Sequence, residues 1–333
     1  MYTLKPFTNF CDPEYLYVSW RRFRRGKRRR KDILVFARHL EDELFSLSEG
    51  LASGRYIHGE YHRFYIRDPK YRMIHKAAVR DRVVHQALYD VLQPLFERKF
   101  FFDSYSGTFS KGTIRAIDRV LSFIRKSSEN GRQAAWVFHG DVDDFFSSID
   151  HKILLAELGK TIRDERYFDI SKKIIHSFSC TPGKGLPLGN LTSQLFANVY
   201  LHELDYFAKQ KLRVRHYVRY NDDFFIVADN CEELQMFASH IKQFLSNELN
   251  LILPEDKIKI RSLGWGVDIL GAVAVPWGVV SRPRVRKAAE RTITSVSRKG
   301  YTEKWQSAVS YIGLLGNTKS FFLREKLRLA YLT

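Results

Sequence analysis

Apolar and polar residues alternate along this chain with two different periods, which predict a mixture of helices and strands. Residues 79–98 carry apolar side chains at helical spacing, and residues 1–50 and 232–248 also read as helical. Residues 55–76 alternate in strand fashion around Asp68-Pro69, a dipeptide that favours a turn. The beginning of the chain therefore predicts a strand pair between two helical stretches.

Further along, apolar runs end abruptly in acidic or turn residues, as buried strands do. Residues 135–149 and 215–228 contain such strands, and a Gly/Pro-rich loop over 183–190 precedes a helix that we expect to begin near Thr192. A lysine-bearing turn at 253–260, a strand-turn-strand at 267–281 and a basic helical stretch from Arg282 complete the pattern. This order is neither a regular β-α alternation nor all-helical. It predicts an α+β fold, with an antiparallel sheet covered by helices on one face.

Charge points to a polyanionic partner. The 333 residues contain 55 Lys and Arg against 37 Asp and Glu, a formal net charge of +18, and such proteins gain affinity for nucleic acid by releasing counterions from phosphates. A dense basic run, RRFRRGKRRRK, spans residues 21–31. It could be a solvated helix face, but its all-positive character and the interleaved Phe23 favour phosphate contact. The predicted RNA-binding residues are Arg21, Arg22, Arg24, Arg25, Lys27 and Arg28.

The cysteines and the apolar runs indicate the cellular compartment. The three cysteines, Cys11, Cys180 and Cys231, lie far apart and indicate neither a disulfide framework nor a zinc site, which favours a reducing compartment. The N-terminus lacks the pattern of a signal peptide, and no apolar run approaches the ~20 residues of a membrane span. We expect a cytoplasmic protein that does not contact membranes.

Three aspartates are the candidate catalytic residues. Asp141 ends an apolar strand, and Asp222-Asp223 lie at the tip between two apolar segments. Taken alone the tip could be a simple hairpin, for which Asn221-Asp222 is good turn chemistry. Adjacent strands could instead bring the carboxylates together as an oxygen-rich site for Mg²⁺, where two ions ~3.5–4 Å apart support nucleotidyl transfer. Asp150 is better read as a helix N-cap than as a ligand.

A resemblance to a known family agrees with that chemistry. The segments GDVDDFFSSID, GLPLGNLTSQLFANVYLHELD and VRYNDDFFIVA resemble the palm motifs of reverse transcriptases, RDPKYRMIHKAAVRDRVVHQAL resembles their fingers, and GVDILGAVAVP resembles the primer grip. The five segments occur in family order over about residues 50–320. The chain is thus similar to bacterial reverse transcriptases of the group II intron-like retroelement superfamily. The resemblance implies a right-hand polymerase fold: a basic helical region at 1–50, fingers at 51–135, palm at 136–275 and helical thumb at 276–333.

The resemblance also assigns roles to residues. It implies an RNA-directed DNA polymerase with two Mg²⁺ ions, replaceable by Mn²⁺, and with Lys257 or the nearby Lys259 as general acid for pyrophosphate. Phe146 would exclude a ribose 2′-hydroxyl, a reading that we favour over its alternative as a core aromatic, and Gly189 would permit close approach of the nucleotide. The implied metal ligands are Asp141, Val142, Asp222 and Asp223. The implied dNTP-binding residues are Lys70, Arg72, Asp144, Phe145, Phe146 and Gly189. The implied template and primer residues are Tyr220, Trp265, Gly266, Leu270 and Gly271.

Departures from the common bacterial pattern leave the subclass open. Leu188 before Gly189 and Ser193-Gln194 after it resemble diversity-generating retroelements, whereas Asp143-Asp144 and Asn221 do not fit that group. An antiphage defence enzyme that copies a dedicated noncoding RNA is the other setting. The expected partners are a structured RNA template, nascent cDNA and dNTPs, with an accessory protein or a homo-oligomer left open. The alternative function is a catalytically idle, maturase-like RNA-binding scaffold.

The histidines carry no metal-ligand spacing. His75, His85, His139 and His151 are scattered among apolar or basic stretches, and the sequence favours core or surface positions for all four.

Overall fold

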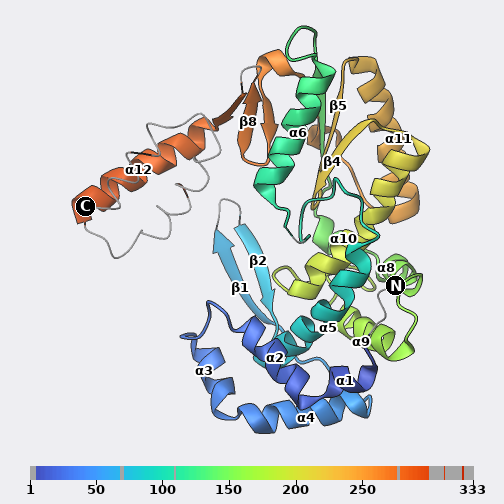
Figure 1. Cartoon of the computed structure of the whole chain (residues 1–333), viewed down its shortest axis with the longest axis vertical. Helices are drawn as coiled ribbons and strands as arrows, with labels where there is room; N and C mark the ends of the chain where they lie inside the picture. The colour runs from blue at the N-terminus through green and yellow to red at the C-terminus, as the bar shows by residue number, and fades with distance from the viewer. Residues whose placement is uncertain are drawn as a thin grey trace. The chain divides into compact units, whose positions relative to one another are not determined.

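The computed structural model describes residues 5–67, 71–108, 110–275 and 278–299, together with residues 311 and 325 (Figure 1). The chain forms two compact units, each assembled from separate segments. The first unit contains Met1–Phe102, Val142–Phe207 and Lys242–Leu253. The second unit contains Asp103–Asp141, Ala208–Ile241 and Pro254–Thr333. The division into fingers, palm and thumb remains a prediction, because compact units and functional regions need not share boundaries.

The first unit begins with helices, as the sequence predicts. Asp12 caps the second of them: its side chain accepts a hydrogen bond from Glu14 N at 2.8 Å, and Pro13 occupies the first turn. The fully buried Trp20 anchors this helix in a layer that packs against a long helix, α5. These helices are α1 (Phe7–Cys11), α2 (Pro13–Phe23), α3 (Lys31–Arg38), α4 (Leu40–Ala52) and α5 (Val79–Glu97).

An antiparallel ribbon and a second group of helices complete the first unit. Strands β1 (His62–Arg67) and β2 (Tyr71–Lys76) pair with Tyr65 opposite Met73, which confirms the predicted strand pair. Asp150 accepts hydrogen bonds from Lys152 N and Ile153 N at 2.9 and 3.4 Å, which confirms it as an N-cap. The remaining helices are α7 (Phe145–Ser148), α8 (His151–Gly159), α9 (Glu165–His176) and α10 (Leu191–Tyr206), followed by a π-helical turn at Phe207–Lys211.

The second unit is built on a four-stranded antiparallel sheet with the order β4-β5-β3-β6. The strands are β3 (Trp136–Asp141), β4 (His216–Tyr220), β5 (Asp223–Ala228) and β6 (Ile258–Ser262). Helix α6 (Thr113–Ser127) packs against β4 and β5. Its apolar residues share one core with Val137, Val218 and Phe225, which alternate onto the same face of the sheet. The predicted antiparallel sheet with a helix-covered face is therefore confirmed.

Smaller elements surround this sheet. A three-stranded sheet contributes Val267, Ile269 and Ala272 to the same core. Helix α11 (Cys231–Leu249) contains residues of both units. The other elements are β7 (Val267–Ile269), β8 (Ala272–Val275), β9 (Gly278–Ser281), α12 (Pro283–Lys299) and two 3₁₀ turns at Glu255–Lys257 and Leu263–Trp265. Among the described helices, none is both long and apolar enough to span a membrane.

Candidate active site

The sheet of the second unit brings two of the predicted catalytic residues side by side. Strands β3 and β5 pair so that Asp141 stands directly opposite Asp223. Directly opposed residues of an antiparallel pair point to the same face of the sheet, so both carboxylates lie on one face, at the end of the two central strands. Their side chains are 30% and 33% exposed. The strand ends therefore present two partly accessible carboxylates at neighbouring positions.

Asp222 lies in the tight turn between β4 and β5. Tyr220 pairs with Asp223, so Asn221 and Asp222 form a two-residue loop. Asn221 has a φ of 53°, a left-handed conformation that asparagine tolerates better than most residues. Its side chain accepts a hydrogen bond from Ser106 Oγ, and its carbonyl accepts one from Arg219 Nη1 at 3.1 Å. The turn geometry gives a physical reason for asparagine at this position.

Each of the two opposed carboxylates meets a nitrogen donor. Lys257 Nζ lies 2.7 Å from Asp141 Oδ2, and His139 Nε2 lies 2.6 Å from Asp223 Oδ1. His139 precedes Asp141 by two positions and therefore shares its face of β3. The imidazole also stacks on Phe225, with ring centroids 4.6 Å apart and planes inclined by 12°. The contact of His139 with Asp223 was missed from the sequence, although its place two residues before Asp141 was a usable signal.

The carboxylate oxygens are suitable ligands for a hard divalent cation, but their side chains do not converge as a metal site. Among the described residues, no group of three or more His, Cys, Asp or Glu side chains converges as a metal site. Within that same part of the chain, Asp141 and Asp223 each use one oxygen for the hydrogen bonds above, which leaves Asp141 Oδ1 and Asp223 Oδ2 for a ligand. Oxygen-only donors are what Mg²⁺ and Mn²⁺ prefer. The donor set therefore fits such an ion, while Lys257 and His139 hold the carboxylates. Val142, the fourth predicted ligand, directly follows Asp141 and is buried.

A close contact behind the carboxylates fixes the strand ends. The ring of Phe224, which is fully buried, lies over Gly140. A Cβ atom at Gly140 would come within 2.9 Å of the Phe224 Cε1 and Cε2 atoms and closer still to Cζ. Gly140 precedes Asp141 and Phe224 follows Asp223, so this contact locks together the two positions that carry the acids.

The predicted primer residues also lie in the second unit. The Tyr220 hydroxyl accepts a hydrogen bond from Thr113 Oγ1 at 3.0 Å, and its ring packs partly against the core. Trp265 is 88% exposed. Leu270 and Gly271, with φ of 48° and 95°, form the two-residue turn between β7 and β8, as expected of a type I′ hairpin. Gly266 also has a positive φ, 75°. An exposed indole is compatible with the predicted primer contact, which remains a prediction.

In the first unit, the loop that contains Gly189 is held by the ribbon. Gly189 has a φ of 103°, and a Cβ atom there would lie 3.2 Å from Ile74 Cγ2. His75 N donates to Leu188 O at 3.4 Å, and Asn190 Nδ2 donates to His75 O at 3.1 Å. Asn190 is buried and was not singled out in the sequence. The glycine is required by its backbone conformation as well as by its close approach to β2.

A cavity of about 350 Å³ opens beside this loop. Phe64, Ile74 and Leu191 give it an apolar part. Its cationic lining residues are Lys27, Arg30, Lys76 and Arg82. Burial, together with the neighbouring charges of Arg82 and Arg30, lowers the pKa of Lys27. Cations crowded in this way are stabilised when an anion joins them. Arg72 lies on the same face of β2 as Ile74, two residues away, whereas the predicted partner Lys70 lies outside the described residues.

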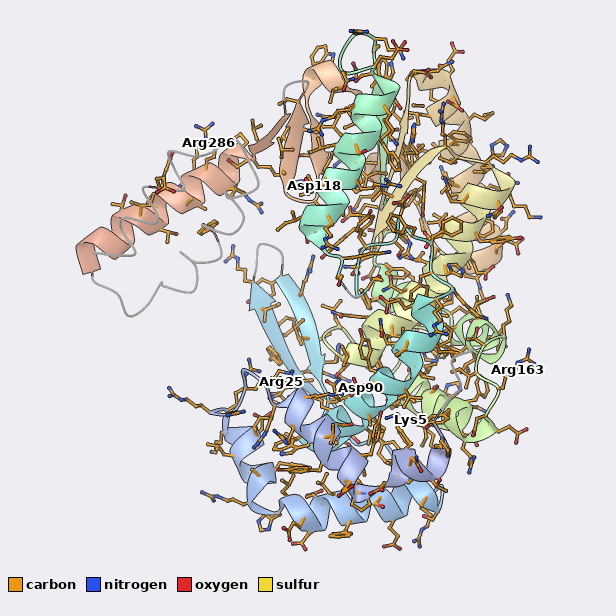
Figure 2. All side chains as sticks on the ribbon, viewed as in Figure 1. Lys5, Arg25, Asp90, Asp118, Arg163 and Arg286 are labelled. Atoms are coloured by element: carbon orange, nitrogen blue, oxygen red, sulfur yellow. The ribbon has the colours of Figure 1, made fainter. Side chains whose placement is uncertain are left out.

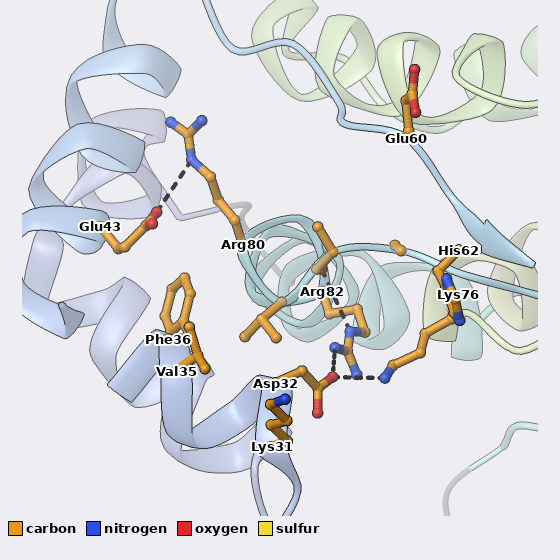
Figure 3. A pocket seen from close by; sticks show the side chains of 13 residues that line it. Lys31, Asp32, Val35, Phe36, Glu43, Glu60, His62, Lys76, Arg80 and Arg82 are labelled. Atoms are coloured by element: carbon orange, nitrogen blue, oxygen red, sulfur yellow. Dashed lines mark hydrogen bonds and ion pairs between the residues drawn. The ribbon is translucent and has the colours of Figure 1, made fainter. Parts of the chain in front are cut away.

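A larger cavity of about 740 Å³ lies at the base of the ribbon and differs in its charge balance (Figure 3). Asp32 accepts hydrogen bonds from Arg82 at 2.6 Å and ion-pairs with Lys76 at 2.7 Å. Burial alone would raise the pKa of Asp32, but the hydrogen bonds from Lys76 and Arg82 outweigh it and lower the pKa to about 2. Arg80 likewise faces Glu43 at 3.9 Å. Most of the cations on this rim are already paired.

Two predicted dNTP-binding residues after Asp141 have contacts that stabilise the fold. Asp144 adopts a left-handed conformation, φ 40°, at the start of α7, and its Oδ1 accepts a hydrogen bond from Ser147 Oγ at 3.0 Å. Phe145 is only 2% exposed, so its side chain belongs to the core, and its predicted dNTP contact can involve the backbone alone. Phe146 is partly exposed and packs edge-on against Phe145, at 5.4 Å. Its predicted role against the 2′-hydroxyl stays open to test.

The basic run near the N-terminus is mostly exposed, but not in all its parts. Arg25, which is labelled in Figure 2, and Arg28 are exposed. Arg22 is also exposed, but its guanidinium is paired with Asp90 at 2.8 Å. The interpretation of Phe23 as part of a phosphate-binding surface is wrong: this ring is 6% exposed and packs in the core, beneath the ammonium of Lys27 at 4.4 Å. The apolar helix face, not an exposed basic face, determines the position of Phe23.

The sequence also matches known proteins. The profile of the family described as reverse transcriptase (RNA-dependent DNA polymerase) matches residues 66–314. The protein YkfC of Escherichia coli strain K12 is 24% identical over 297 residues, covering 77% of this chain and 76% of YkfC. The group II intron-encoded protein LtrA of Lactococcus lactis subsp. cremoris is 23% identical over 302 residues, covering 69% of this chain and 49% of LtrA. The chain thus spans about half the length of LtrA.

Solved structures share the fold. Telomerase from Candida albicans, in complex with a fragment of telomeric RNA, superposes with a TM-score of 0.55 at 8% identity, covering 84% of this chain and 61% of that chain. Apo telomerase from Candida tropicalis gives a TM-score of 0.55 at 11% identity, covering 83% and 56%. At such identities the likeness is one of fold, and it confirms the right-hand polymerase architecture.

Proposed function

This chain belongs to the reverse transcriptase (RNA-dependent DNA polymerase) family, and from that premise we propose that it copies an RNA template into DNA by metal-assisted nucleotidyl transfer. The observation that carries the proposal is the register of β3 and β5, which sets Asp141 opposite Asp223 at the strand ends. Asp222, in the adjoining turn, supplies a third carboxylate from the same tip. Three acids at neighbouring strand ends suit a pair of Mg²⁺ ions.

In this proposal the aspartates hold the ions, His139 positions Asp223, and Lys257 donates a proton to the pyrophosphate. Bound Mg²⁺ would activate the primer 3′-hydroxyl and neutralise the departing pyrophosphate. His139 holds Asp223 by one oxygen, so that the other can face a cation. Lys257, whose ammonium lies 2.7 Å from Asp141, is the candidate proton donor to pyrophosphate. The exposed Lys259 pairs across the sheet with His139 and, within the described part of the chain, forms no hydrogen bond or ion pair with either aspartate, so it is the weaker candidate.

Nucleotide selection would belong to the first unit. Arg72 and the cations beside Gly189 suit a triphosphate or a template phosphate. Phe146 is accessible enough to meet a sugar 2′-hydroxyl. Leu188 in place of an amide would remove one hydrogen bond beside the nascent base pair, which would relax base checking. That property would suit a diversity-generating element, although an antiphage defence role, with a dedicated structured RNA, remains the other setting.

The test is incorporation of labelled dTTP on poly(A)/oligo(dT) with Mg²⁺ or Mn²⁺. The wild-type chain should incorporate dTTP, and Asp222→Asn or Asp141→Asn should abolish it. Asp118→Asn is the matched control, because Asp118 is an exposed aspartate on α6 in the same unit (Figure 2). Full activity of the Asp141→Asn variant would refute the proposed site. In a second assay, sequencing the cDNA would separate the two settings: errors at template adenines favour diversification, and short repetitive products oppose it.

A second candidate, an idle RNA-binding scaffold, is favoured by one observation. The Asp141 and Asp223 carboxylates are turned toward Lys257 and His139, and no three-ligand group converges among the described residues. If the wild-type chain binds RNA but incorporates no nucleotide with either metal ion, this scaffold function replaces the polymerase.

A further inference from the structure

One face of the β1–β2 ribbon carries tyrosines and arginines to which the sequence and the proposed site give no role. Arg63, Tyr65 and Arg67 alternate onto this face of β1, and Tyr71 and Met73 onto the same face of β2, because Tyr65 pairs with Met73 and Arg67 with Tyr71. We call these five residues the outer face. The rings of Tyr65 and Tyr71 lie diagonally across the ribbon, with centroids 5.6 Å apart.

The two faces of the ribbon differ in their surroundings. On the opposite face, Ile74 approaches Gly189, and Phe64 lines the cavity of about 350 Å³. At the base of this side of the ribbon, His75 packs edge-on against Phe178 of the same unit, with ring centroids 4.6 Å apart. Beyond that base Tyr65 is 64% exposed, Tyr71 70% and Met73 41%. Three large apolar side chains therefore stand in solvent on one small antiparallel ribbon, the upper strands of the first unit in Figure 1.

Charge identifies the kind of partner that such a face fits. The five residues of the outer face include two cations, Arg63 and Arg67, and no carboxylate. Aromatic rings interleaved with cations bind unpaired nucleic acid, because any base can stack on a ring while the phosphates meet the cations. A protein partner would also use tyrosine, methionine and arginine. The uniform positive charge, in a chain of net charge +18, favours a polyanion.

We propose that the outer face binds single-stranded RNA, with bases stacked on Tyr65 and Tyr71 and phosphates on Arg63 and Arg67. The inference rests on the proposed function, since the RNA would be an unpaired part of the template molecule. The face lies opposite the one that approaches Gly189, so it would hold a stretch of RNA other than the nucleotide being copied.

The test measures binding of a labelled single-stranded RNA by fluorescence anisotropy, without dNTPs or Mg²⁺. The Tyr65→Ala/Tyr71→Ala variant should raise the Kd at least about tenfold, given the loss expected when a stacking aromatic is removed. Tyr65→Phe/Tyr71→Phe should restore tight binding, since the rings remain. Arg63→Gln/Arg67→Gln should lower the slope of log K against log salt by about 1.4, at roughly 0.7 per phosphate contact.

Controls separate this face from general effects. Phe45→Ala/Tyr206→Ala removes two aromatics of the same unit that are 63% and 47% exposed, and it should leave the Kd unchanged. Duplex RNA should bind the wild-type and the Tyr65→Ala/Tyr71→Ala variant equally, because its bases are not free to stack. Wild-type affinity of the alanine pair for single-stranded RNA would overturn the inference. So would a change in sedimentation with intact RNA affinity, which would identify a protein interface. Because the assay needs no catalysis, it fails or succeeds independently of polymerase activity.

Discussion

Gly140 is the position where one added methyl group should disturb both strand ends at once. An alanine Cβ there would lie within 2.9 Å of two Phe224 ring atoms and closer to a third, distances that packed carbon atoms do not adopt. Phe224 is fully buried, so its ring cannot swing into solvent. Overpacking of this kind costs about 1–3 kcal/mol. We expect Gly140→Ala to lower the free energy of unfolding by that amount.

Activity should fall along with stability, because the clash lies between the residues that precede Asp141 and follow Asp223. Chemical denaturation measures the first effect and dTTP incorporation the second. Phe224→Leu supplies the partner of a double-mutant cycle: the smaller side chain should accommodate the new methyl group. The double variant should therefore be more stable than the sum of the single effects predicts, by roughly 0.5–3 kcal/mol.

The control is Gly264→Ala in the same unit. A Cβ atom at Gly264 would meet only Ser262 Oγ, at 3.9 Å, an ordinary contact distance. This variant should unfold like the wild-type protein, within about 0.5 kcal/mol. Strictly additive effects of Gly140→Ala and Phe224→Leu would show that the ring contact is not the cause, and the reasoning about this part of the site would be wrong.

Three further outcomes follow from the structure. His139→Ala should weaken Mn²⁺ binding, measured by electron paramagnetic resonance, by about 10–100-fold because Asp223 loses its hydrogen bond, whereas His139→Gln should preserve much of it. Gly189→Ala should lower dTTP incorporation, and stability by ~1 kcal/mol or more, since φ is 103° and Ile74 Cγ2 lies 3.2 Å from the added Cβ atom. Ile74→Ala, which removes that Cγ2 atom, should relieve only the contact, and the same two assays would show it. Burial, with the charges of His58 and Arg82, lowers the pKa of His85 to about 3. Below about pH 6.5 the unfolded chain therefore binds a proton at His85 that the folded chain does not bind. The free energy of unfolding, measured by chemical denaturation, should fall from pH ~6.5 toward pH 3, and less steeply in His85→Gln.

Local sequence pattern was sufficient to predict most helices and strands and the strand-end positions of the three aspartates. Period-2 alternation identified the ribbon, and apolar runs ending in acidic or turn residues identified the sheet strands. Helix α10 begins at Leu191, one residue from the predicted start. The apolar strand before Asp141 and the apolar segments around Asp222-Asp223 were enough to expect a shared strand-end position. Hydrogen-bond register then set Asp141 opposite Asp223. These successes depend on information that lies within a few residues of each site.

What the sequence did not indicate depends on contacts between distant segments. Phe23 stands between two arginines in the sequence, yet it is buried by partners that only the fold supplies. Asn190 bridges to β2 over a separation of 115 residues. His139 was treated as an unremarkable histidine because its partner, Asp223, is 84 residues away. The strand register brings His139 to Asp223, and tertiary packing brings the other residues to their partners.

The hydrogen-bond donors around Asp141 and Asp223 offset the repulsion between the two carboxylates. Two opposed aspartates would repel each other at the end of adjacent strands, yet Lys257 contacts Asp141 and His139 contacts Asp223, each through a single carboxylate oxygen. Asp141 and Asp223 would hold a divalent cation through their remaining oxygens, and its charge would add to the compensation that Lys257 and His139 already supply. A cation on the same carboxylate would weaken the attraction between Lys257 and Asp141. Lys257 would then move toward the phosphates of the incoming nucleotide. The lysine that contacts Asp141 would in this way also be positioned to donate a proton to the pyrophosphate, as proposed above.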